Sequence, residues 1–161
     1  MNPSEVFHED LKFGDKLEHY VLATIQEQYP DAFKIQGYFK PYDILVPHIN
    51  TSIEVKGDYE SNRTNNYLIE VSFAGKPSAL STTEADFWVI IDGHHMIWIT
   101  PQQIKQCIQA FNVPSRTLTG RGDDKSKEAH LVRRDYIKAH ATQVDPIPSE
   151  ATIHRDNINH Q

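Results

Sequence analysis

Two short segments, residues 42–46 and 52–57, constrain the fold most, because apolar and charged side chains alternate along them. Side chains on an extended strand point alternately to its two faces. The apolar residues of the second segment therefore face a core, whereas Glu54 and Lys56 point to the other side. The proline and asparagine within residues 47–50 favour a turn between the two segments. The pattern predicts a β-hairpin with one charged face.

Asp43 lies near the start of the first segment. In a hairpin that turns near residue 49, Asp43 is almost opposite Glu54, so three charged groups, including Lys56, converge at one end of a small sheet. Taken alone, a Glu-Val-Lys triplet is usually a solvated strand face, and an aspartate at a strand start is often only a turn residue. The combination is less common than either piece and makes these three residues candidate catalytic groups.

Hydrolysis of a phosphodiester needs such a set of groups. The carboxylates of Asp43 and Glu54 are oxygen ligands of the kind that Mg²⁺ prefers, with Mn²⁺ as a substitute, and the carbonyl of Val55 is a further candidate ligand. A bound ion lowers the pKa of a water molecule and offsets the charge on phosphate oxygens. Lys56 can orient the attacking water or stabilise the pentavalent state. These residues predict a Mg²⁺-dependent phosphodiester hydrolase.

The arrangement of Asp43, ten intervening residues and the Glu-Val-Lys triplet resembles the PD-(D/E)xK nuclease superfamily, which includes restriction enzymes and Holliday-junction resolvases. Residues 14–18 are similar to the segment in which resolvase-like members carry a helical glutamate. The resemblance makes Glu18, an acidic residue, a candidate fourth member of the site, both catalytic and metal-binding, with an ordinary exposed helix carboxylate as the alternative. Three further segments resemble small phage-encoded nucleases of this superfamily: residues 64–70, 75–78 and 82–88.

Two positions depart from the family pattern. The Pro-Asp pair of the family is interrupted here by Tyr42, which leaves the metal-binding aspartate itself in place. In many phage members a glycine stands where this chain has Asn65, a residue type that tolerates left-handed backbone better than most.

The resemblance implies an α/β fold with a restriction-endonuclease-like core, in which a central mixed β-sheet is flanked by α-helices. It implies a metal-dependent endodeoxyribonuclease of phage type, with branched or recombination intermediates as one class of substrate and host DNA as another. Resolvases of this fold act as dimers, which leaves a homodimer open. The chain has no long apolar run and no signal-peptide pattern, so we expect no membrane partner and a cytoplasmic location, that of the host for a phage protein.

Several residues are secondary candidates. Glu70 is either a supporting or second-metal carboxylate, or simply the polar face of a strand. The candidate nucleic-acid contacts are Lys76, Arg121, Arg133 and Arg134, although a lysine in a turn is usually only solvated.

The net charge of −6 opposes this interpretation, because proteins that contact many phosphates usually carry a basic surface. The alternative is a non-catalytic module that binds nucleic acid or protein on a nuclease-like fold. Against that alternative, clustered carboxylates repel one another when no metal is bound. An RNA-directed nuclease would share the same site chemistry.

The length of 161 residues suits one domain. We expect a single nuclease domain over residues 1–141 and a polar, poorly ordered tail over residues 142–161. The single cysteine, Cys107, is expected to be a small buried apolar residue. The expected elements are helices over about 4–28 and 101–111, a helical turn at 81–84, strands over 33–39, 42–46, 52–56, 67–73, 87–91 and 96–99, a loop over 113–127, and one short element within 128–139.

Overall fold

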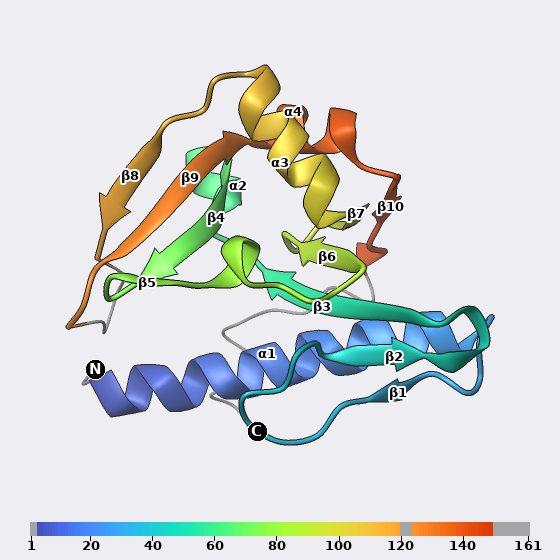
Figure 1. The fold of residues 1–161 in the computed structure, drawn as a ribbon. Helices are drawn as coiled ribbons and strands as arrows, with labels where there is room; N and C mark the ends of the chain where they lie inside the picture. Colours follow the sequence, from blue (N-terminus) through green and yellow to red (C-terminus); the bar gives the residue numbers. More distant parts are fainter. Residues whose placement is uncertain (1–2, 120–123, 150–161) are drawn as a thin grey trace.

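A long helix, α1 (Pro3–Gln26), lies along one face of the larger of two β-sheets (Figure 1). The computed structural model describes residues 3–119 and 124–149. The helix buries an apolar residue at nearly every turn, as a helix packed on a sheet requires: Phe13, Leu17, Val21 and Ile25. Ala23 is exposed, because it lies off the four-residue spacing of these residues.

The larger sheet has the strand order β1-β2-β3-β6-β7-β10. Its strands are β1 (Phe33–Lys34), β2 (Ile44–Val46), β3 (Thr51–Gly57), β6 (Phe87–Ile91), β7 (His95–Ile99) and β10 (Gln143–Pro146). Strands β3 and β6 run parallel, whereas the other neighbours in this sheet are antiparallel. The predicted mixed sheet in an α/β protein is therefore confirmed.

The smaller sheet has the order β5-β4-β9-β8 and is antiparallel throughout its described strands. Its strands are β4 (Asn66–Phe73), β5 (Lys76–Pro77), β8 (Ser115–Leu118) and β9 (Lys127–Arg133). The remaining elements are the short helix α2 (Ser61–Thr64), the helices α3 (Pro101–Ala110) and α4 (Arg134–His140), and the 3-10 turns η1 (Pro47–Ile49) and η2 (Ala79–Ser81).

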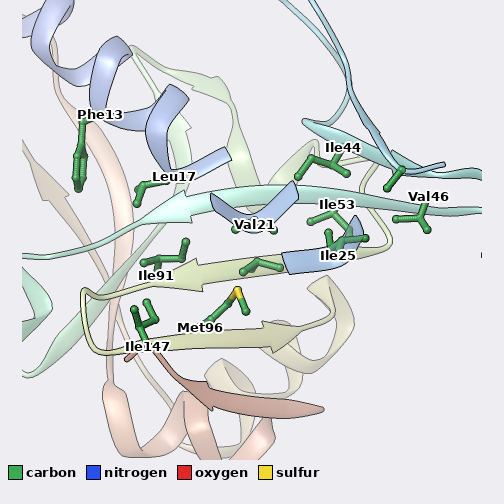
Figure 2. Packing of buried hydrophobic residues seen from close by; sticks show 12 residues of the cluster. Phe13, Leu17, Val21, Ile25, Ile44, Val46, Ile53, Ile91, Met96 and Ile147 are labelled. Atoms are coloured by element: carbon green, nitrogen blue, oxygen red, sulfur yellow. The ribbon is translucent and has the colours of Figure 1, made fainter. Parts of the chain in front are cut away.

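Two apolar cores flank the larger sheet, one on each face. The first joins α1 to strands β2, β3, β6 and β7, and Figure 2 shows the side chains of α1 pointing into it. The second lies between the larger sheet, the smaller sheet, α3 and α4, and it contains Trp88 and the fully buried Cys107. Strand β6 alternates between the two cores, which explains its continuous apolar sequence. Burial of each large side chain contributes roughly 1.5–3 kcal/mol.

The smaller sheet is the main difference from the expected elements. The loop expected over 113–127 contains β8, and the single element expected within 128–139 is β9 followed by α4. The strand expected over 33–39 is limited to β1, and the helical turn expected at 81–84 lies slightly earlier, at η2. Polar edge strands such as β8 pair through their backbones, so apolar periodicity does not reveal them.

The domain boundary predicted at residue 141 was wrong. Strand β10 pairs with β7 over four residues, and Ile147 beyond it is buried in the first core. The folded region therefore continues at least to residue 147, although the segment is polar, because backbone pairing to the edge of β7 holds it. The rest of the predicted tail, residues 150–161, lies outside the described residues. No helix within the described ranges is long and apolar enough to cross a membrane.

Candidate active site

The hairpin of β2 and β3 brings Asp43 beside Glu54. Ile44 is paired with Ile53, so the next residues outward, Asp43 and Glu54, are neighbours. The backbone N–H of Asp43 donates to the carbonyl of Ile53 at 2.9 Å, and the backbone N–H of Val55 donates to Oδ2 of Asp43 at 2.7 Å. These bonds hold Asp43, a residue that is only 6% exposed, immediately before β2. The predicted convergence of Asp43 and Glu54 is confirmed as geometry.

Lys56 completes this group on the same face of β3. Its Nζ lies 3.5 Å from Oε1 of Glu54 and 5.2 Å from the ring centroid of Trp88. The indole is itself fixed, since its Nε1 donates to Oγ1 of Thr83 at 3.0 Å. A cation over an indole face is held electrostatically by the ring. Trp88 is also buried in the second core, so the same side chain fills that core and supports Lys56.

Lys40 is the site residue that the sequence reasoning missed. Its Nζ contacts two carboxylates: it donates to Oε1 of Glu18 at 2.8 Å and lies 3.1 Å from Oδ1 of Asp43. Glu18 comes from α1, on the other face of the larger sheet from Glu54, and it reaches Asp43 through this lysine. The sequence signal for Lys40 is its position three residues before Asp43 and directly before Pro41.

The charges of the site are unevenly balanced. Burial raises the pKa of Glu54 to about 7; Lys56 opposes the rise, and the negative charge of Asp43 adds to it. Burial alone would lower the pKa of Lys40, but the hydrogen bonds and charges of Glu18 and Asp43 raise it above the ordinary lysine value. Of the two carboxylates, Asp43 and Glu54, Glu54 is the less well compensated by positive charge. A cation bound next to Glu54 would therefore be favoured.

The donor set of this pair fits a hard divalent cation. Among the described residues, no group of three or more His, Cys, Asp or Glu side chains is placed to hold a metal ion. Mg²⁺, however, is commonly bound by one or two carboxylates and retains several waters. Asp43 and Glu54 provide two adjacent carboxylates, and the backbone of Val55 lies directly beside them. The metal-binding roles of Glu18 and of the Val55 carbonyl remain predictions.

The secondary candidates lie on other elements. Glu70 is on β4, where its Oε2 accepts from Ser78 at 2.9 Å and its Oε1 lies 3.7 Å from Nζ of Lys127. Lys76 is exposed on β5. The structure therefore brings Glu70 and Lys76 to the smaller sheet and not into the pair formed by Asp43 and Glu54.

The predicted arginines have partners within the chain. Arg133 pairs with Asp135 at 3.1 Å, whereas Arg134 donates to the side chains of Asn62 and Asn65 at 3.0 and 3.1 Å. Asn65 has the left-handed backbone (φ 63°) that its place in the family pattern predicted. Arg134 therefore ties α2 to α4, and a role in nucleic-acid binding is an additional hypothesis for it. Arg121 lies outside the described residues.

Two hollows meet at Lys56. A recess of about 240 Å³ contains Glu54, Lys40 and residues 82–84, and a cleft of about 540 Å³ runs toward the smaller sheet. Lys56 and Trp88 line both. Glu54 is therefore accessible from the recess, whereas Asp43 lies behind it and lines neither hollow.

A buried carboxylate near this cleft has a structural role. Asp92 accepts from the hydroxyl of Tyr67 at 2.8 Å and from the backbone N–H groups of His94 and His95 at 2.9 and 2.7 Å. Burial raises the pKa of Asp92, but these hydrogen bonds together lower it by more, so the net shift of the pKa is downward. This network fixes the turn between β6 and β7.

Comparison with protein-family models, curated proteins and solved structures finds no match to this chain.

Proposed function

We propose that the chain is a metal-dependent endodeoxyribonuclease with a restriction-endonuclease-like core. The observation that carries the proposal is the adjacency of Asp43, Glu54 and Lys56 on one hairpin, with the Asp43 carboxylate held by the N–H of Val55. Two neighbouring carboxylates in a partly buried setting carry a repulsion that a divalent cation relieves. The resemblance to the PD-(D/E)xK superfamily rests on these same residues.

The chain's own groups would divide the work as follows. Asp43 and Glu54 would hold Mg²⁺ or Mn²⁺, and the bound ion would supply an activated water and offset the phosphate charge. Lys56, held between Glu54 and the Trp88 ring, would place a fixed positive charge beside the attacked phosphate. The Val55 N–H orients Asp43 through Oδ2, whereas Lys40 lies at Oδ1 and would have to yield that oxygen to the ion.

A non-catalytic module remains the second candidate, because of one observation. Lys40 contacts both Glu18 and Asp43, and Lys34 lies 3.8 Å from Glu18, so part of the acidic cluster is offset without a metal ion. The net charge of −6 also weakens general attraction to nucleic acid. In this reading the hairpin would keep the nuclease-like geometry while a protein or a nucleic acid binds elsewhere.

A cleavage assay separates these candidates. Linear duplex, single-stranded and four-way-junction DNA are incubated with Mg²⁺ and with EDTA, using the natural chain, Lys56→Ala and the control Lys105→Ala on α3. The proposal expects cleavage that needs the metal, is lost in Lys56→Ala and is retained in Lys105→Ala. Cleavage that survives loss of Lys56 contradicts the mechanism. Absence of cleavage, together with no Mg²⁺-induced rise in melting temperature, favours the module.

A further inference from the structure

The cleft beside Lys56 has one wall made of leucines. Leu68 on β4 is paired with Leu131 on β9, and both line the cleft together with Leu118 of β8. Alternation on β4 sends Tyr67 and Ile69 into the second core, so Leu68 faces the opposite side and is 39% exposed. Apolar side chains therefore border an open space that the folded chain itself does not fill.

The other parts of the cleft are polar. Lys56 and Trp88 stand where the cleft joins the acidic recess, and Thr64 and Asn66 lie at the end near α2. The amide of Asn66 donates to the carbonyl of Thr64 at 3.2 Å. Asparagine side chains pair well with the donor and acceptor pattern of a base edge. The lining combines an apolar wall with a few polar groups, and the proposed catalytic lysine belongs to it.

We infer that this cleft receives the unpaired nucleoside adjacent to the phosphodiester at Lys56. This inference rests on the proposed function. The cleft has a volume of about 540 Å³, which lies in the range of small-ligand sites. This volume admits one nucleotide and is too small for a duplex. The lining has three carboxylates, of Asp58, Glu60 and Glu70, and its one arginine, Arg63, is paired with Glu60 at 2.9 Å. This acidic excess disfavours a second phosphate, whereas the leucine wall suits the flat, weakly polar face of a base. The preferred substrate is then DNA with an unpaired nucleotide at the cut, such as a single strand or a frayed branch.

Binding of deoxyadenosine monophosphate, which has no phosphodiester to cleave, tests the inference apart from catalysis. Amide chemical shifts are followed by NMR during titration of the natural chain, Leu68→Trp and the control Phe73→Trp. Phe73 lies on the same strand, is similarly exposed and does not line the cleft. The expected result is shift changes at Leu68 and Leu131, weakened about tenfold in Leu68→Trp and by less than about twofold in the control.

Cleavage rates complete the test. Leu68→Trp should lower kcat/KM for single-stranded DNA by about tenfold more than for duplex DNA, whereas Phe73→Trp should leave this ratio unchanged. If Leu68→Trp does not fold, the test uses the chemical-shift changes of the natural chain on nucleotide binding, and the variant Leu131→Trp takes the place of Leu68→Trp. Nucleotide binding without any cleavage would refute the proposed nuclease and retain the cleft. Two results would overturn this inference but leave the proposed nuclease intact. One is cleavage of DNA without nucleotide-induced chemical-shift changes in the cleft. The other is chemical-shift changes that depend on protein concentration, because a second copy of the chain then fills the cleft.

Discussion

The ammonium group of Lys40 lies 3.1 Å from Oδ1 of Asp43. The same ammonium group donates to Glu18, so one lysine from the loop between β1 and β2 bridges two carboxylates from separate elements, and Lys34 adds a weaker contact to Glu18 at 3.8 Å. Glu54 has only the looser contact with Lys56, at 3.5 Å. The acidic residues of the candidate site are thus neutralised to different degrees, and their variants should respond differently to Mg²⁺ and to pH.

Replacing Lys40 should expose competition between the lysine and a metal ion. Lys40→Met removes the positive charge from Glu18 and Asp43, so the melting temperature without metal should fall by a few degrees, about 2–4 °C per kcal/mol. The affinity for Mg²⁺ should rise about tenfold, as measured by calorimetry. Lys105→Met is the matched control.

The alkaline dependence of this effect has a defined sign. Because the pKa of Lys40 is raised in the folded state, its contribution to stability is complete below the ordinary lysine pKa of 10.5 and is lost as the pH rises through the raised value. The stability difference between Lys40→Met and the natural chain should shrink there. For the preceding prediction, an unchanged Mg²⁺ affinity in Lys40→Met would argue against competition between Lys40 and the metal ion.

Glu54 should make the protein less stable as the pH rises through the weakly acidic range. Its pKa is near 4.5 in an unfolded chain and about 7 when folded, so between these values the folded state binds more protons. The free energy of unfolding then falls with increasing pH, by up to about 3 kcal/mol. Glu54→Gln should reduce this slope in urea unfolding curves measured from pH 4.5 to 7.5, with a remainder from Asp58, whose pKa burial also raises, whereas Glu84→Gln should keep the full slope. A parallel slope in Glu54→Gln would contradict the assignment.

The hydroxyl of Tyr67 should matter for stability but not for metal binding. Tyr67→Phe removes the hydrogen bond to the buried carboxylate of Asp92, at a cost of about 1–3 kcal/mol, because the acceptor is charged. Urea unfolding measures the loss, and calorimetry should show unchanged Mg²⁺ affinity. Tyr38→Phe, at a residue that is 83% exposed, should have almost no effect. Equal effects of the two substitutions would show that the buried hydrogen bond contributes nothing.

Strand β10 should be required for full stability. A chain that ends at residue 141 lacks the four pairs with β7 and the burial of Ile147, whereas a chain that ends at residue 149 keeps both. We expect the shorter chain to lose at least about 2 kcal/mol in urea unfolding, from the lost apolar burial alone. Equal unfolding midpoints for the two chains would place β10 outside the cooperative unit.

The sequence by itself determined the hairpin and the charged face of its second strand. Period-two alternation around Glu54 and the turn at residues 47–50 act locally, so they predicted the register that places Asp43 next to Glu54. The four-residue apolar spacing of α1 and the capping box at Thr100, with the proline that follows it, are equally local signals for helices.

Only the tertiary structure decided which distant residues join this hairpin. Lys40 reaches Glu18 because α1 packs under the larger sheet, and Lys56 lies over Trp88 because β6 is paired with β3. The pairing of β10 with β7 likewise depends on backbone groups, whatever the side chains of β10. Such contacts link segments far apart in the chain, and no local pattern specifies them, since their free energy comes from pairing and burial achieved only in the complete fold.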